Sequence, residues 1–168
     1  MRVVDDNDND VPTGCLGEIV LRGENILKGY YKNPEATKNA FRNGWFHTGD
    51  VGYRDQDGFY YIVDRKSDMI IRGGENIYPR EIDEVLYKHP AVAVAATIGV
   101  PDQLYGEEVA AFIVLKDGTR ANEEELIAHC KSELADYKCP KLIRIVKDIP
   151  KGPTGKLLKR ELAAKYRG

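Results

Sequence analysis

The stretch DRKSDMIIRGGENIYP, residues 64–79, decides how the rest of this sequence is interpreted. Its charged start leads into a short apolar segment, Met69–Ile71, which we expect to be a strand. The strand enters Arg72-Gly73-Gly74, where paired glycines let the backbone bend freely and let a ligand approach closely. A guanidinium directly before them can pair with a carboxylate or a phosphate. The stretch therefore predicts a hinge followed by a loop that faces a ligand.

The residues before this stretch are expected to be mostly β-structure. A strand at the N-terminus and a second at Gly17–Leu21 flank an acidic, Asn-rich loop at residues 5–10. Asn33, which precedes a proline, predicts the N-cap of a short helix. A hairpin turn at residues 55–58 leads to an aromatic and β-branched strand over residues 59–63.

The residues after the stretch alternate helices and strands. We expect a helix from Pro79 to His89, strands over residues 91–100 and 109–115, a helix capped by Asn122, a strand over residues 142–146, a loop over residues 150–156 and a final helix through Tyr166. This order predicts an α+β domain with a small three-stranded sheet and flanking helices. The boundary with the preceding β-rich part is expected near residues 65–68.

Composition bounds the class of protein. The chain has 168 residues, 42% of them hydrophobic, with a formal net charge of −2, so a packed core is expected and no global basic field invites nucleic acid. Eight basic residues nevertheless fall late in the chain, which suits a phosphate-rich small ligand or a solvated surface: Lys138, Lys141, Arg144, Lys147, Lys151, Lys156, Lys159 and Arg160.

The cysteines and histidines give no sign of a metal or a disulfide. Cys15, Cys130 and Cys139 are odd in number and lack C-x-x-C spacing, and the three histidines have no metal-ligand pattern. No apolar run of membrane-spanning length and no signal peptide are visible, so the expected location is cytoplasmic. Cys139 is expected to be structural because no histidine partner is suggested, and His47 to be packed among aromatic neighbours.

Four segments carry candidate site residues, each with a plain structural alternative. Asp50 in Thr48-Gly49-Asp50 suits a ribose diol or caps a turn, and Arg65 makes a second nucleotide contact or pairs with a nearby aspartate. Gly73-Gly74 borders a passage for a thin ligand or forms only a turn. Lys156, on a loop rich in Gly and Pro, neutralises developing phosphate charge or is a surface lysine at a helix start. The loop is not a phosphate-binding P-loop, because Leu157 follows the lysine and the upstream glycine is missing.

Taken together, the motifs resemble the adenylate-forming superfamily, which includes acyl-CoA synthetases, peptide-synthetase adenylation domains and firefly luciferase. The resemblance covers essentially the whole chain and is carried, in order, by GEIVLRG, GYYKNPEAT, GWFHTGD, FYYIVDRKSDMIIRGGENIYPREIDEVL, PDQLYGEEVAAFIVL and IPKGPTGKLLKREL. Within the superfamily, these motifs are most similar to those of fatty-acid–CoA ligases.

The resemblance implies a role for each candidate. Asp50 and Arg65 would hold the ribose of ATP and of the acyl-adenylate, and Lys156 would bridge the substrate carboxylate and the α-phosphate. Ser67 falls at the hinge of the family, where Asp or Lys is usual. The CoA-binding set would be Gly73 and Gly74 along the pantetheine tunnel, with Arg72 and Lys138 towards the phosphates of coenzyme A.

The resemblance also implies an organisation. Residues 1–64 would be the tail of a large N-terminal domain, a β-barrel remnant, and residues 65–168 the whole mobile C-terminal domain. The phosphate loop and acyl pocket of the family are absent here, so Met1 is expected to begin a fragment or truncated product that is inactive alone. The expected parent reaction uses ATP to join a carboxylic acid to coenzyme A, and a fatty acid is the expected substrate. Mg²⁺ is implied for the full-length enzyme, with no metal ligand expected in this chain.

Two other functions remain open at this point. One is a non-catalytic module that binds CoA or AMP, or that a partner completes with the missing N-terminal domain. The other is an adenylation domain that loads a carrier protein. Apolar surface on residues 1–64 is also expected to drive homo-oligomer formation.

Overall fold

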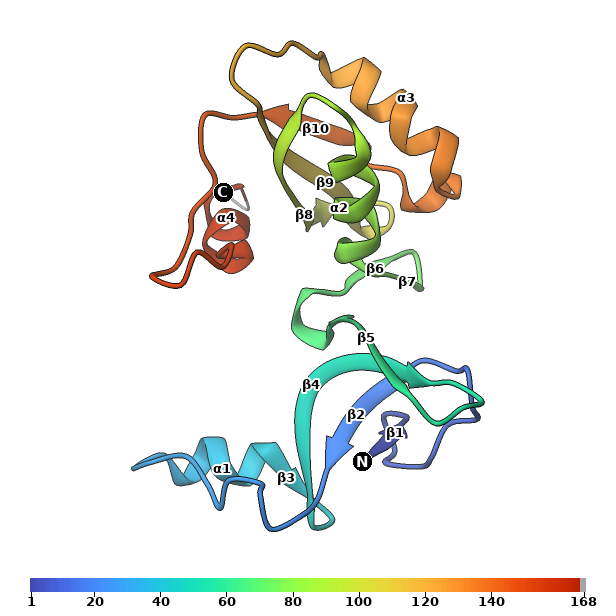
Figure 1. Ribbon diagram of the computed structural model, residues 1–168, viewed down its shortest axis with the longest axis vertical. Helices are drawn as coiled ribbons and strands as arrows, with labels where there is room; N and C mark the ends of the chain where they lie inside the picture. Colours follow the sequence, from blue (N-terminus) through green and yellow to red (C-terminus); the bar gives the residue numbers. More distant parts are fainter. Residues whose placement is uncertain (167–168) are drawn as a thin grey trace. The chain divides into compact units, whose positions relative to one another are not determined.

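The computed structural model describes residues 1–166, and the chain forms two compact units. The first, unit 1, is Met1–Ser67, and the second, unit 2, begins at Asp68. Each unit has its own sheet (Figure 1). Residues 167 and 168, which fall in the expected second domain, lie outside the described residues.

Unit 1 is a small antiparallel β-structure. Its elements are β1 (Arg2–Val4), β2 (Gly17–Leu21), α1 (Pro34–Ala40), β3 (Phe41–Arg42), β4 (Trp45–Arg54) and β5 (Tyr60–Arg65). The strand order is β1-β2-β4-β3, and β5 also pairs with β4. The long strand β4 thus touches three neighbours and organises the unit.

Unit 2 combines one five-stranded sheet with three helices. Its elements are β6 (Ile70–Arg72), β7 (Glu75–Ile77), α2 (Pro79–Lys88), β8 (Val92–Asp102), β9 (Gly106–Leu115), α3 (Glu123–Glu133), β10 (Leu142–Ile145) and α4 (Lys159–Tyr166), with a 3₁₀ turn at Asp136–Lys138 (η2). A second 3₁₀ turn, Lys66–Asp68 (η1), crosses the boundary between the units. The strand order is β10-β9-β6-β7, with β8 paired to β9. Among the described strands of unit 2, only the β9–β10 pair is parallel.

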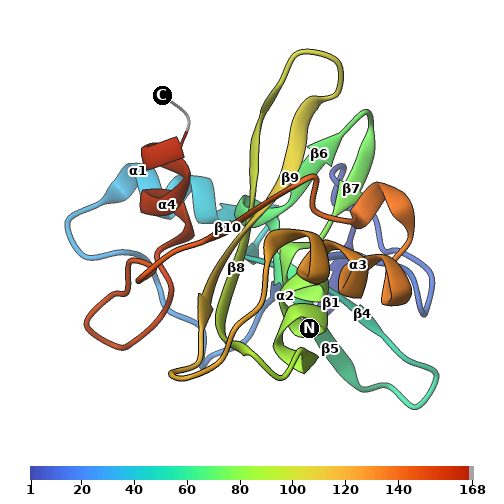
Figure 2. The ribbon, with the colours of Figure 1, turned by 90° about the horizontal axis from the view of Figure 1, so that it is seen from above.

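The central strand β9 is apolar from Val109 to Leu115 because both faces of the sheet are covered there. Val109, Ala111 and Ile113 pack in one core with side chains of α2 and α3. Ala110 and Phe112 alternate with them and pack in a second core with Leu162 of α4. Figure 2 shows this layering, with α2 and α3 on one side of the β8–β9 hairpin and α4 on the other.

The predicted fold class is confirmed, and the size of the predicted sheet is corrected. The three strands that we expected correspond to β8, β9 and β10, but the sheet gains β6 and β7 at its edge. Met69–Ile71 was expected as a short strand, and the observed strand is Ile70–Arg72. The chain turns after it at the two glycines, and Glu75–Ile77 pairs with it. The second strand of this hairpin is short and polar, so periodicity did not indicate it.

Both predicted helix caps are confirmed. The side chain of Asn33 accepts a hydrogen bond from Ala36 N at 3.0 Å. The side chain of Asn122 accepts one from Glu125 N at 2.8 Å. Each cap satisfies a backbone donor that the first turn of a helix leaves unpaired.

Candidate functional site

The sheet of unit 1 places Asp50 and Arg65 directly opposite each other on β4 and β5. Arg65 Nε lies 2.9 Å from Asp50 Oδ1, and the Arg65 side chain is half exposed while that of Asp50 is partly buried. Asp64, the neighbour that we considered as a partner, instead accepts a hydrogen bond from the backbone N of Arg65. The pair therefore presents a carboxylate and a guanidinium together at one edge of the unit.

A register shift in β4 fixes the backbone at Asp50. Glu18 lies opposite Val51 and Val20 opposite His47, so three residues of β4 face one residue of β2. Gly49 takes φ +72°, which favours glycine. The Thr48 hydroxyl donates to Ile19 O at 2.7 Å and accepts from Asp50 N at 3.0 Å. Bulges of this kind often re-aim a side chain next to a functional site.

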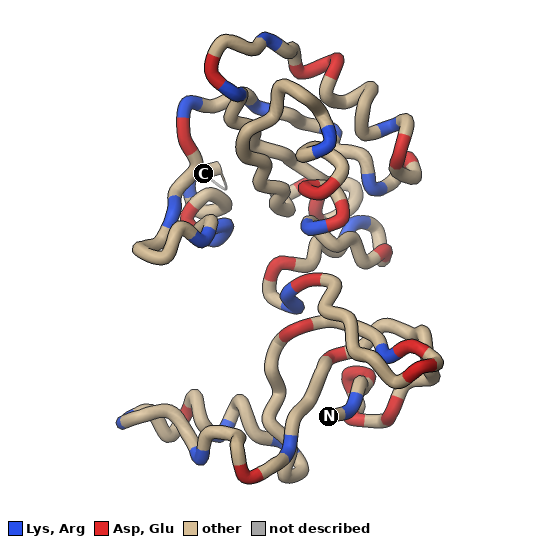
Figure 3. The backbone as a smooth tube through the Cα atoms, in the orientation of Figure 1, with Lys and Arg blue, Asp and Glu red and all other residues tan. Residues whose placement is uncertain are grey.

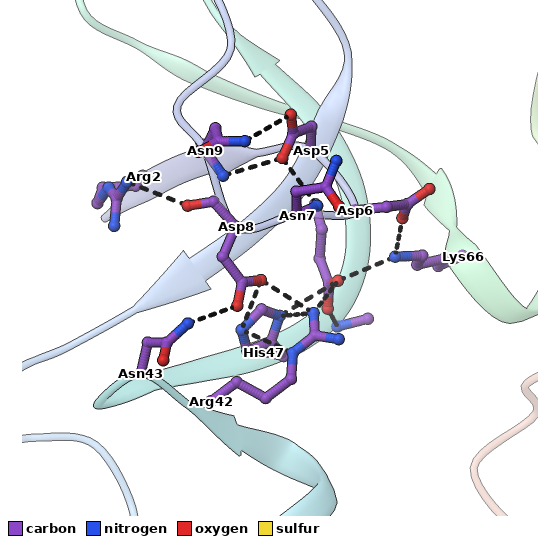
Figure 4. A network of polar contacts seen from close by, with 12 residues as sticks. Arg2, Asp5, Asp6, Asn7, Asp8, Asn9, Arg42, Asn43, His47 and Lys66 are labelled. Atoms are coloured by element: carbon purple, nitrogen blue, oxygen red, sulfur yellow. Dashed lines mark hydrogen bonds and ion pairs between the residues drawn. The ribbon is translucent and has the colours of Figure 1, made fainter.

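A polar network around Glu18 of β2 stabilises this bulge (Figure 4). Glu18 accepts hydrogen bonds from Gly49 N at 3.2 Å and from Lys66 Nζ at 3.2 Å. His47 Nδ1 lies 3.3 Å from Glu18, and its Nε2 lies 3.6 Å from Asp8. Burial disfavours the charged Glu18, but the contacts of His47 and Lys66 outweigh it and keep the pKa of Glu18 below its ordinary value. His47 is thus packed, as expected, and its ring nitrogens face the carboxylates of Glu18 and Asp8.

The hairpin β6–β7 presents Gly73 and Gly74 at its turn. Both glycines have positive φ, +58° and +90°, and a Cβ on Gly74 would meet no atom within 4 Å. Within this chain, therefore, the backbone conformation of the turn, not crowding, requires glycine at Gly74. Gly73 N donates to Tyr105 O at 2.9 Å, which ties the turn to the β8–β9 connection.

Arg72 is held by this hairpin and its neighbour strand. Arg72 Nε donates to Glu108 Oε1 at 2.6 Å, and the guanidinium carbon lies 4.0 Å from the centre of the Tyr105 ring. Burial disfavours the charged Glu108, but Arg72 and a backbone bond keep the pKa of Glu108 below its ordinary value. These two contacts occupy much of the guanidinium.

Lys138 is also paired. Its Nζ lies 2.8 Å from both carboxylate oxygens of Glu81, so η2 is joined to the first turn of α2. Ser67 lies in η1, at the boundary between the two units. The structure therefore places Ser67 where the chain passes from one compact unit to the next.

Lys156 lies on a closed loop that is fixed at its base. Gly152 N donates to Lys156 O at 2.8 Å, Leu158 N donates to Pro150 O at 2.8 Å, and Lys151 and Leu157 form an antiparallel bridge. The Lys156 side chain is exposed, and none of the ion pairs found in residues 1–166 involves it. Basic residues recur along the chain from η2 to α4 (Figure 3), but Lys138 and Lys159 are paired with carboxylates.

The two thiols of unit 2 are buried. Cys130 is fully buried, and burial raises its pKa to about 12. Burial likewise raises the pKa of Cys139, whose Sγ donates to Ala135 O at 3.5 Å. Cys15 is exposed and unpaired by any disulfide.

In residues 1–166, no group of three or more His, Cys, Asp or Glu side chains is arranged to hold a metal ion. No helix in the same range has the length and apolar character needed to cross a membrane.

The predicted site residues thus fall into two groups. Unit 1 brings Asp50 and Arg65 together, and unit 2 carries the Gly73-Gly74 turn with Arg72, the Lys138–Glu81 pair and the Lys156 loop. Sequence reasoning missed Glu18, which accepts from Gly49 N, and Glu108, which accepts from Arg72. It also missed Asp83 of α2, which accepts from Lys159 at the start of α4. The available signal was an acidic residue inside an otherwise apolar strand or helix face, which a buried partner explains.

Residues 81–156 match the family described as the AMP-binding enzyme C-terminal domain. This match identifies an AMP-binding C-terminal domain in that part of the chain. The predicted resemblance is therefore confirmed.

Several relatives are CoA ligases. The chain is 49% identical over 162 residues to a sulfoacetate–CoA ligase of Cupriavidus necator, covering 96% of this chain and 32% of the relative. It is 51% identical over 146 residues to a long-chain-fatty-acid–CoA ligase of Bacillus subtilis, covering 87% of this chain and 26% of the relative. The chain therefore spans about a third of the length of such relatives or less.

Solved structures agree in fold. ATP-bound MatB of Rhodopseudomonas palustris has a TM-score of 0.93 at 38% identity, covering 99% of this chain and 33% of that chain. The o-succinylbenzoate CoA synthetase of Bacillus subtilis, in complex with its acyl-adenylate intermediate, has a TM-score of 0.89 at 39% identity, covering 95% of this chain and 33% of that chain.

Proposed function

We propose that this chain is the C-terminal part of an ATP-dependent acid–CoA ligase. In the first half-reaction, a carboxylate oxygen attacks the α-phosphorus of ATP, and acyl-AMP and pyrophosphate are formed. In the second, the sulfur of CoA attacks the acyl carbon, and acyl-CoA and AMP are formed. The named relatives that are CoA ligases support this reaction class.

The observation that carries the proposal is the exposed ammonium of Lys156 on a loop closed by backbone hydrogen bonds. A fixed cation that protrudes from a domain can stabilise the negative charge that develops on the α-phosphate and the attacking carboxylate. Among the basic residues near it, Lys159 is neutralised by a carboxylate, whereas no such partner engages Lys156 in the described part of the chain. Lys156 is therefore the proposed catalytic residue of adenylation.

Asp50 and Arg65 are proposed to hold the nucleotide. A carboxylate accepts hydrogen bonds from a ribose diol, and a guanidinium donates to it. The ion pair between them aligns the carboxylate, and both side chains retain some exposure for a ligand. Their position on paired strands gives a rigid platform.

Ser67 is proposed as the hinge, and Gly73-Gly74 as the edge of the passage for the pantetheine arm. Rotation at Ser67 would replace the Lys156 loop by the glycine turn between the two half-reactions. Arg72 and Lys138 are the basic side chains proposed towards the CoA phosphates. Their carboxylate partners, Glu108 and Glu81, would have to be released or shared for that contact.

The residues of this chain do not fit a magnesium site. Mg²⁺ is usually held by carboxylates together with substrate phosphates, and no suitable cluster exists within residues 1–166. In the proposed function, Mg²⁺ arrives bound to the phosphates of ATP.

A fatty acid is the first acid to test. The long-chain-fatty-acid relative is 51% identical and the sulfoacetate relative 49% identical, so these residues do not separate the two acids. The test is an assay of the full-length enzyme, meaning this chain together with the N-terminal domain that its relatives carry, against both kinds of acid.

The roles are tested by separating the half-reactions. In the full-length enzyme, Lys156→Ala should lower ATP–pyrophosphate exchange by about 10²–10³-fold, comparable to the loss of one oxyanion donor. CoA transfer from supplied acyl-adenylate should change little. Equal losses in both half-reactions would contradict the assignment of Lys156, and robust exchange by the 168-residue chain alone would contradict the proposal that it is only a part.

A further inference from the structure

Each of the two candidate loops of unit 2 leads directly into a helix. The β6–β7 hairpin with its glycine turn leads directly into α2, which begins at Pro79. The Lys156 loop leads directly into α4, which begins at Lys159. The link between α2 and α4 is the pair Asp83–Lys159, with Lys159 Nζ donating to Asp83 Oδ2 at 2.7 Å.

This pair is buried. Asp83 is only 7% exposed, and the side chain of Lys159 is 18% exposed. The second oxygen of Asp83 accepts a hydrogen bond from Thr97 N of β8 at 2.7 Å. Asp83 therefore joins three elements, the helix α2 that carries it, the sheet through Thr97 and α4 through Lys159.

The apolar contacts of α4 leave the position of the helix along the sheet less determined. Leu162 packs with Phe112 in the second core, and the ring of Tyr166 lies 4.3 Å from that of Phe112. Burial of apolar surface favours contact but has little directional preference. A short hydrogen bond between charged groups has a defined direction and distance, so it fixes the rotation and register that apolar contacts leave free.

Lys159, which the ion pair holds in place, lies three residues from Lys156. Leu158, directly before α4, donates to Pro150 O, and the Lys151–Leu157 bridge closes the loop one residue further. A shift at Lys159 is therefore carried through these bonds to Lys156. A buried ion pair is weak evidence for stability, because apolar residues of similar volume often stabilise as well, and fixing a register is its best-attested use.

We infer that the Asp83–Lys159 ion pair is a positioning device that sets Lys156 relative to α2 and thereby to the Gly73-Gly74 turn. Lys159 and Asp83 are positioning residues and need not touch substrate. The catalytic consequence rests on the proposed function of Lys156 in adenylation, whereas the structural consequence does not.

The structural consequence is tested on the 168-residue chain by amide hydrogen exchange. In Lys159→Met, the Gly152 and Leu158 amides should exchange about 10-fold faster or more, because local opening sets exchange rates. Amides of β8 and β9 should be unchanged. Lys159→Arg should retain protection, and Lys165→Met, an exposed lysine of the same helix, is the matched control. Unchanged protection of Gly152 and Leu158 in Lys159→Met would overturn the inference.

If Lys159→Met does not fold because Asp83 is left buried without a partner, the double variant Asp83→Asn/Lys159→Met removes both charges and takes its place. Faster exchange confined to the Lys156 loop supports the inference in this variant too. Equal protection to the wild type, or equally faster exchange throughout the sheet, would overturn it.

The catalytic consequence is tested in the full-length enzyme. Lys159→Met should lower pyrophosphate exchange by up to about 10²-fold, since a displacement near 1 Å can cost that much. CoA transfer from supplied acyl-adenylate should be retained. Lys156→Ala/Lys159→Met should be no slower than Lys156→Ala, because the pair acts only through Lys156. An additive loss in the double variant would overturn the positioning role, whereas a Lys156→Ala enzyme with normal adenylation would contradict the proposed function instead.

Discussion

Unit 1 and unit 2 bury their side chains to very different extents. Among the described residues, five hydrophobic side chains are buried in unit 1 and twenty-one in unit 2. Those of unit 1 are all valine or isoleucine: Val3, Val4, Ile19, Val20 and Val51. Unit 2 fills both faces of its sheet, whereas unit 1 leaves Phe59, Tyr61 and Ile62 exposed. The comparison indicates that unit 2 carries its own core and that unit 1 depends more on polar contacts.

Separation of the units is expected to have the largest effect. The polypeptide 68–168 should fold alone with a cooperative urea transition, because its two cores remain intact. The polypeptide 1–67 should lack such a transition, since a domain of about 60 residues is already marginal and this one buries little apolar surface. Circular dichroism with urea titration measures both.

The polypeptide 1–67 is expected to self-associate. Exposed apolar surface and sheet edges favour contact between copies, so any ordered form of 1–67 should sediment as an oligomer. A monomeric and cooperatively folded 1–67 would remove the difference between the units.

The second largest effect is expected at Phe112, which is fully buried beneath α4. Phe112→Ala should destabilise unit 2 by about 3–5 kcal/mol, through lost burial and the cavity that remains. Leu104→Ala is the matched control, because Leu104 is 78% exposed in the same β8–β9 hairpin. It should change stability by less than about 0.5 kcal/mol. Similar urea midpoints for the two variants would mean that the second core contributes little.

The pH dependence should have opposite signs at Glu18 and Asp83. The pKa of Glu18 lies below its ordinary value, so Glu18 stabilises unit 1 above about pH 4.3, and this is lost as pH falls through the lowered pKa. Burial raises the pKa of Asp83, and the nearby Lys159 offsets this only in part. The contribution of Asp83 is therefore fully present below about pH 3.9 and is lost as pH rises through the raised pKa.

Variants separate these two contributions. Glu18→Gln should reduce the loss of stability of unit 1 at low pH. The fluorescence of Trp45, the single tryptophan of the chain, monitors the unfolding of this unit. Asp83→Asn should reduce the loss of stability of unit 2 as pH rises. The helical circular dichroism signal monitors the unfolding of this unit. Slopes of the same sign in both units would mean that Lys159 outweighs the burial of Asp83.

The sequence predicted the elements of unit 2 well because their signals are local. Asn122 caps its helix through a bond to a residue three positions on, and the apolar run of β9 reflects coverage on both faces. It did not predict partners that are distant in sequence. Arg72 meets Glu108 and Lys159 meets Asp83 only after the sheet has formed, so neither spacing nor periodicity indicates them. The bulge at Thr48-Gly49 likewise depends on the pairing of β2 with β4.

Thiol labelling has the smallest expected effect on stability, because it compares the exposure of the cysteines in the two units without destabilising either unit. Cys15 of unit 1 is exposed, whereas Cys130 and Cys139 of unit 2 are buried with raised pKa values. Because the thiolate is the reactive form, one thiol should react with a thiol reagent at neutral pH in the native chain, and three in denaturant. Cys15→Ser should remove the native reaction and leave the two slow thiols, whose labelling then reports the opening of unit 2. If Cys130 in the native chain reacted as fast as Cys15, the core beneath α2 and α3 would be open, and the contrast between the units would fail.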